Sequence, residues 1–179
     1  MLLEVIAISL FAGWIFGGKI SHLVDVKLVG AEFIIAAFVA QMLVPRMAAI
    51  DQSLGYLFHV GSYLMLLIAF SRNEPTPAVG LMAMGVFLNF VVISLNGGMP
   101  VRTAIPIVFT DSIHLKLAGT TWLPWLGDVI PWPLPAGLGG LVSVGDILLS
   151  AGVATMIVRG MRYSGKRRKI ENGNRCRTG

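Results

Sequence analysis

The sequence predicts an all-α integral membrane protein, and three observations support this fold class. Hydrophobic residues make up 55% of the 179 residues and charged residues only 13%, whereas soluble domains carry about a quarter charged residues. The mean hydropathy is +0.78. The apolar residues are grouped in long runs that short polar connections separate. We therefore expect about five transmembrane helices in a compact bundle, with no additional soluble domain.

The boundaries of the apolar runs define the expected spans. Each run approaches the roughly 20 residues that a helix needs to cross a bilayer. The first run has no preceding basic residue and contains Glu4, so we expect a retained helix and not a signal peptide. Pro45 and Arg46 are expected to close the second run. The predicted spans are residues 2–17, 29–45, 53–70, 78–95 and 141–158, and a long loop occupies 96–140.

The distribution of Lys and Arg predicts the orientation. Most of the net charge of +5 lies after Val158, so we divide the chain into a transmembrane domain, 1–162, and a basic tail, 163–179. Because basic residues favour the cytoplasmic side, we expect the C-terminus inside and, with five spans, the N-terminus outside. The charge therefore indicates membrane lipid, and not nucleic acid, as the partner. The tail has no apolar period, so we expect it to be disordered and dispensable for folding.

The loop at 96–140 is expected to cap the outer end of the bundle. Its three tryptophans alternate with prolines, and such amphipathic rings favour the headgroup depth of a membrane. Asn96 and the two glycines after it form a turn signal where the fourth span ends. The pair Gly127–Asp128 in this loop has a counterpart, Gly145–Asp146, at the start of the fifth span.

Polar residues within the spans predict the position of a site, since such residues are costly inside a bilayer. With the orientation above, several of them lie in the outer half of their spans, which is the pattern of one shared outward-facing pocket. Helical spacing adds others on the same faces. The alternative is that they form separate hydrogen bonds between helices. The candidate ligand-binding residues are Gln41, His59, Tyr63, Asn89, Asn96, His114, Asp128 and Asp146.

Asp146 has two possible roles. A carboxylate inside a helix needs a charged partner or protonation, and His59 is the titratable candidate at a matching depth. Alternatively, Asp146 and Ser143 cap a helix that begins later than residue 141. A metal site is not expected, because the three histidines and the single Cys176 form no metal-binding motif. No nucleophile elbow, P-loop or dinucleotide-binding fingerprint is present either.

The motifs NGGMPV, LGDVIP and SVGDILL and the segment around His114 give the chain a family resemblance. It resembles an uncharacterised family of bacterial multi-pass membrane proteins, known as domain of unknown function 5317. The resemblance covers about Met1 to Arg162. It implies a protein of the bacterial plasma membrane with several spans and no assigned activity, so no functional residue is carried over from the family.

Three functions are compatible with these patterns. The first is a non-catalytic protein that binds a lipid or quinone in an outer-leaflet pocket, or serves as a subunit with other membrane proteins or with itself. The second is an intramembrane enzyme acting on a lipid headgroup or isoprenoid carrier, with Asp128, Asp146 and His114 as acid and base groups. The third is a proton-coupled transporter acting as a homodimer, although the usual internal repeat is not visible.

Overall fold

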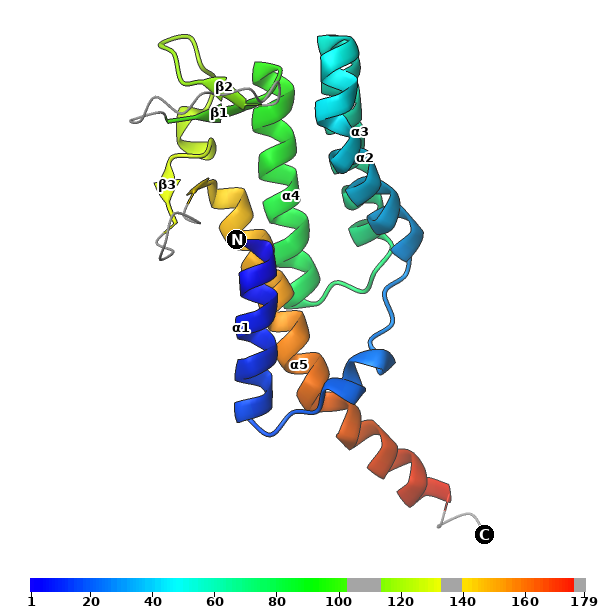
Figure 1. Cartoon of the computed structure of the whole chain (residues 1–179). Coiled ribbons are helices and arrows are strands. Elements are labelled where there is room, and N and C mark those ends of the chain that lie inside the picture. Colours follow the sequence, from blue (N-terminus) through cyan, green and yellow to red (C-terminus); the bar gives the residue numbers. More distant parts are fainter. Residues whose placement is uncertain (103–113, 133–139, 176–179) are drawn as a thin grey trace.

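The protein is a helical bundle, and the long loop before the last helix lies at one end of it (Figure 1). The computed structural model describes residues 1–102, 114–132 and 140–175, and their side chains except those of 114 and 163–175. Within these described residues, four helices are long and apolar enough to cross a membrane. They are α2 (Ala31–Ile50), α3 (Gln52–Ser71), α4 (Pro77–Asn96) and the part Val144–Arg162 of α5 (Val144–Arg175).

The first predicted span is a shorter helix, α1 (Leu2–Ile15), which packs along α5. It ends early because Gly17 adopts φ +77°, a left-handed conformation, and the short 3-10 helix η1 (Ile20–Asp25) follows. Ser9 and Gly13 are buried, and a Cβ on Gly13 would collide with Met161 of α5. The small residues of α1 therefore allow close contact with α5.

The second span is longer than predicted, because α2 continues through Pro45 to Ile50. Proline removes one hydrogen bond, the bond that residue 45 would donate to the carbonyl of Gln41, and the helix tolerates this loss. The last turn of α2 is held against α3, where a Cβ on Gly55 would collide with Ala48. Asp51 then caps α3, and its Oδ1 accepts hydrogen bonds from the backbone of Ser53 and Leu54 at 2.8 and 3.1 Å.

The helices α3 and α4 lie within one residue of their predicted bounds. Thr76 caps α4 through a bond from Val79 N, and Gly97 ends it with φ +78°. The core lies between α2, α3 and α4 and is covered by α5; its buried members are Ala37, Leu66, Phe70, Met82 and Val86. A second cluster under the loop contains Val92, Ile93, Met99 and Leu126.

The loop contains short strands that an all-α prediction did not include. Strand β1 (Met99–Val101) pairs in parallel with β2 (His114–Lys116), and β3 (Ile130–Pro131) pairs antiparallel to β4 (Leu141–Val142). Between them, η2 (Pro124–Leu126) is a single 3-10 turn. These strands form because loop residues near a buried surface need hydrogen-bond partners for their backbone groups.

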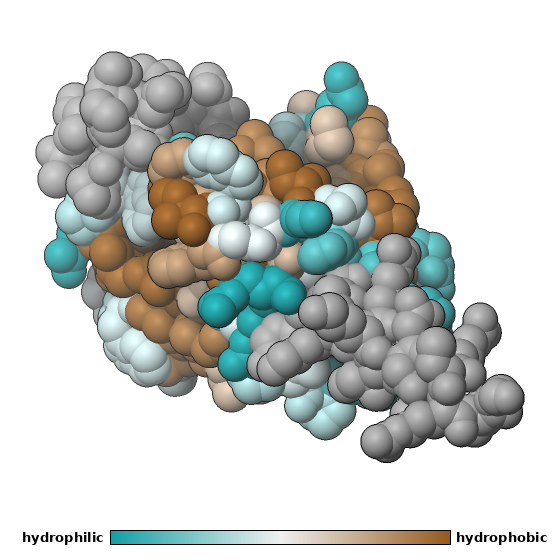
Figure 2. Space-filling model, turned by 90° about the horizontal axis from the view of Figure 1, so that it is seen from below, coloured by the Kyte–Doolittle hydropathy of each residue, from teal (hydrophilic) through white to brown (hydrophobic). Residues whose placement is uncertain are grey.

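The far end of α5 also differs from the prediction. The helix continues through the basic segment to Arg175, where we expected a disordered tail from residue 163. The segment contains no proline, and Lys and Arg are good helix formers, so nothing in it forces the helix to stop. Seen from this end of the bundle, hydrophilic residues gather near the middle and hydrophobic residues flank them (Figure 2).

Candidate ligand-binding site

A buried hydrogen-bond network joins α4 to the first turn of α5. Asn89 of α4 is 1% exposed, and its Nδ2 donates to Asp146 Oδ1 at 2.9 Å. Its Oδ1 accepts a bond from the hydroxyl of Ser143, also at 2.9 Å. The two helices approach closely here because glycines face one another: a Cβ on Gly85 would lie 2.6 Å from Leu149 N, and one on Gly145 would collide with Asn89.

Asp146 is part of a helix cap. Its backbone N donates to Ser143 Oγ at 3.0 Å, while its Oδ2 accepts from Ser143 N at 3.1 Å. This reciprocal pair is a capping box, in which the residue before the helix and the third helical residue satisfy each other's backbone donors. The helix therefore begins at Val144, and the predicted span starting at 141 began three residues too early. The pairing of Asp146 with His59 stays a prediction.

The capped end of α5 forms one wall of a polar cavity of about 260 Å³. Six of the eight predicted site residues line this cavity. It is lined by Gln41 and Val44 of α2, His59 and Tyr63 of α3, Asn89 and Ile93 of α4, Met99, Asp128 and Asp146. The rings of His59 and Tyr63 are tilted against each other with centroids 5.5 Å apart. The matched depth of these residues in the sequence thus corresponds to one shared cavity.

Asp128 enters the cavity from the loop. Its backbone N donates to Pro100 O at 2.8 Å and its carbonyl accepts from Arg102 N at 3.1 Å, so the residue extends the β1–β2 sheet. Gly127 makes this possible, because a Cβ there would collide with the carbonyl of Pro100. Asp128 is 8% exposed. Burial, together with repulsion from the carboxylate of Asp146, raises the pKa of Asp128 to about 7.

Of the other two predicted residues, Asn96 lies elsewhere. Asn96 holds the loop on the end of α4: its Nδ2 donates to Val92 O and Trp122 O, and its Oδ1 accepts from Trp122 N at 2.9 Å. Its amide is therefore used structurally and does not line the polar cavity. The backbone of His114 lies on β2, and its side chain is outside the described residues.

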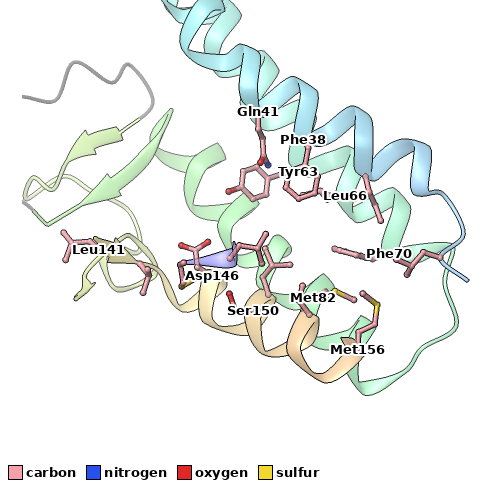
Figure 3. A pocket seen from close by; sticks show the side chains of 17 residues that line it. Phe38, Gln41, Tyr63, Leu66, Phe70, Met82, Leu141, Asp146, Ser150 and Met156 are labelled. Atoms are coloured by element: carbon pink, nitrogen blue, oxygen red, sulfur yellow. The ribbon is translucent and has the colours of Figure 1, made fainter. Parts of the chain in front are cut away.

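A second cavity of about 430 Å³ adjoins the polar one and shares Gln41, Tyr63 and Asp146 with it. Figure 3 shows residues of the α2–α3 hairpin facing those of α4 and α5 across it. Its other walls are almost entirely apolar: Met1, Leu2, Leu28, Ile34, Phe38, Leu66, Phe70, Met82, Leu141, Val142, Leu149, Ser150, Val153 and Met156. Sequence reasoning missed these residues, because an apolar side chain that lines a cavity has the same pattern as one that faces lipid.

The two cavities offer hydrogen-bonding groups beside an apolar chamber. Among the residues that the structure describes, no group of three or more His, Cys, Asp or Glu could hold a metal ion. The two carboxylates come from different segments, Asp128 from the loop and Asp146 from α5, and the described residues that line the cavity include no Lys or Arg. The arrangement suits a molecule with one polar and one apolar part.

Comparison with known proteins places the chain in a family. The model of a family of unknown function, DUF5317, matches residues 22–158. The chain belongs to the DUF5317 family. An uncharacterized protein of Thermotoga maritima is 30% identical over 167 residues, which cover 91% of this chain and 94% of the relative. No solved structure matches the chain. The predicted family resemblance is thereby confirmed.

Proposed function

We propose that this protein is a small, non-catalytic protein of the bacterial plasma membrane that binds an amphiphilic ligand, a lipid or a quinone. The polar head would occupy the polar cavity, and the tail would occupy the apolar cavity beside it. The observation that carries the proposal is that the two cavities adjoin each other and share the side chains of Gln41, Tyr63 and Asp146. In this proposal the N-terminus and the loop face outside, and the basic end of α5 faces the cytoplasm.

The proposal includes a route from the bilayer into the apolar cavity. Its walls include the start of α1, at Met1 and Leu2, and α2, at Ile34 and Phe38. The helix α1 packs on α5, whereas α2 packs on α3, so α1 and α2 have little contact with each other. A ligand could therefore enter sideways from the lipid between these two helices, with its tail leading.

A second function, an intramembrane enzyme, is favoured by one observation: Asp128 and Asp146 line the same cavity. The binding function is preferred because both carboxylate oxygens of Asp146 already accept bonds, from Asn89 Nδ2 and from Ser143 N. An acid or base group must be able to exchange its proton with a substrate, and these bonds hold Asp146 as a fixed acceptor. In this proposal the carboxylates therefore orient a ligand and do not convert it chemically.

The test is the retention of native amphiphiles by the full-length protein. The protein is purified in mild detergent, and bound lipids and quinones are extracted and identified by mass spectrometry. Val153→Phe adds bulk to the wall of the apolar cavity, whereas Ile147→Phe makes the same kind of change at an exposed position of the same helix. Overpacking of a filled site costs about 1–3 kcal/mol, so the first variant should retain about tenfold less ligand.

The control variant Ile147→Phe should retain ligand like the wild type. Thermal unfolding of both variants separates ligand loss from misfolding. Equal retention by a folded Val153→Phe variant would refute binding in this cavity.

A further inference from the structure

The charges around the polar cavity restrict the kind of ligand headgroup that the cavity can bind. Within residues 96–150 the basic residues, other than His114, are Arg102 and Lys116, and both are exposed. Arg46 near the end of α2 is exposed as well. Asp128 and Asp146 line the cavity together with His59, and no Lys or Arg is among the described residues that line it. A phosphate would meet like charge there, because phosphate sites are built from basic side chains or backbone N–H groups.

A hydroxyl in the apolar cavity lacks a partner. Ser150 is 5% exposed, lines this cavity, and its Oγ has no hydrogen-bond partner among the described residues. A serine inside a helix usually bonds to the carbonyl four residues earlier, as Thr155 does to Ala151 O at 2.7 Å. A buried hydroxyl without such a bond costs stability. The Oγ of Ser94 also lacks a partner among the described residues but lines neither cavity, whereas a ligand in the apolar cavity would supply a partner to Ser150.

The spacing between these groups describes the ligand further. Ser150 follows Asp146 by four residues on α5, so the two lie on one face, about 6 Å apart along the helix axis. Figure 3 shows both side chains on the cavity side of α5. A ligand with its head at Asp146 would therefore have a second polar atom at the depth of Ser150, where its apolar tail begins.

We propose that the ligand is a neutral glyceride-type lipid. Its free hydroxyl head is held by Asp128 and Asp146, and one of its ester carbonyls accepts a hydrogen bond from the hydroxyl of Ser150. This inference rests on the proposed function and names the class of ligand for the same site. Carboxylates accept hydrogen bonds from hydroxyls, whereas quinone oxygens are acceptors and would need donors in their place. The raised pKa of Asp128, about 7, lets its carboxyl also donate to the hydroxyl oxygen when protonated.

The experiment compares short-chain probes on the full-length protein in micelles, with binding measured by native mass spectrometry. The reference probe is dioctanoylglycerol. Dioctanoyl phosphatidic acid adds a phosphate, the dioctyl diether of glycerol lacks the ester carbonyls, and decylubiquinone and an alkylamine test other heads. We expect dioctanoylglycerol to bind at least about tenfold more tightly than its phosphate, and about two- to tenfold more tightly than the diether, since one neutral hydrogen bond is removed.

Variants assign each preference to a residue. Ser150→Ala should abolish the difference between ester and diether and leave the discrimination against phosphate intact. Thr155→Val is the control, because its hydroxyl is bonded within α5 and lines neither cavity. Asp128→Asn should reduce the discrimination against phosphate, because it removes one of the two negative charges.

The results separate this inference from the proposed function. Phosphatidic acid, quinone or amine binding as tightly as dioctanoylglycerol would overturn the glyceride assignment while leaving an amphiphile site. Equal binding of ester and diether by the wild type would overturn the role of Ser150. Failure of every probe to bind, together with unchanged lipid retention by Val153→Phe, would refute the proposed function itself.

Discussion

The buried carboxyl of Asp128 should make the stability of the protein depend on pH. Its ordinary pKa is 3.8, and burial beside Asp146 raises it to about 7 in the folded protein. Between these values the folded state keeps a proton that the unfolded state has lost. Unfolding therefore becomes more favourable as the pH rises from about 4 to about 7, and the effect is constant above that range. Asp128→Asn removes this dependence, because an amide does not titrate.

The magnitude follows from the pKa. One proton gives a slope of about 1.4 kcal/mol per pH unit, which falls to half at the folded pKa, so between pH 5 and pH 7 the wild type should lose about 2 kcal/mol that Asp128→Asn keeps. For a chain of this size, 1 kcal/mol shifts the midpoint by about 2–4 °C, which gives a difference of about 4–8 °C. Comparing the change with pH, and not single midpoints, removes any steric effect of the substitution.

The assay is thermal unfolding in detergent, followed by the fluorescence of the four tryptophans between pH 5 and pH 8. The other titratable groups that face Asp128 in the cavity are Asp146 of α5 and His59 and Tyr63 of α3. The wild-type and Asp128→Asn proteins are therefore also compared in a His59→Gln background, where the difference should persist. Asp146→Asn should move the transition to lower pH, because it removes the repulsion. Parallel pH profiles for the wild type and Asp128→Asn would refute the reasoning.

Three further predictions concern packing, capping and topology. Gly85→Ala should destabilise the protein by several kcal/mol in thermal unfolding, because its Cβ would meet the backbone of α5, whereas Gly80→Ala on the same helix has open space and should be neutral or slightly stabilising; equal effects would contradict this packing. Ser143→Ala should cost about 1–2 kcal/mol, since it removes the cap and leaves buried polar groups of its partners unbonded; an unchanged midpoint would contradict the capping role. A cysteine at Thr120 should react with an impermeant reagent from outside, and a reporter fused after Gly179 should be cytoplasmic; the opposite pattern would reject the predicted orientation.

The sequence predicted the ends of those helices that local sequence features determine. The ends of α3 and α4 were predicted within one residue from the apolar runs and from the turn signal that follows Asn96; in the structure Asp51 and Thr76 cap the starts of these helices and Gly97 ends α4. The apolar composition likewise predicted helices long enough to cross a membrane. Pro45 misled the prediction, because packing of the last turn of α2 on α3 outweighs the one hydrogen bond that proline removes.

The polar residues of the candidate site were also found from the sequence, although their interactions were not. A polar residue within an apolar run is conspicuous, and matched depth placed His59, Asn89 and Asp146 together; the structure brings them into one cavity. Depth could not decide between a cap and a pocket wall for Asp146. In the structure Asp146 has both roles. Its carboxylate accepts a bond from Ser143 N in the helix cap and one from Asn89 of α4, and its side chain lines the polar cavity.

The rest was decided by the tertiary structure. Asp128 lines the same cavity as Asp146, and Gly127 allows this by letting the loop lie against Pro100, a residue far from it in the sequence. The apolar cavity was invisible in the sequence for a different reason. In a bilayer, side chains that face lipid and side chains that line a cavity are both apolar, so composition and periodicity are the same for each. The relative positions of the helices determine which apolar side chains enclose the cavity.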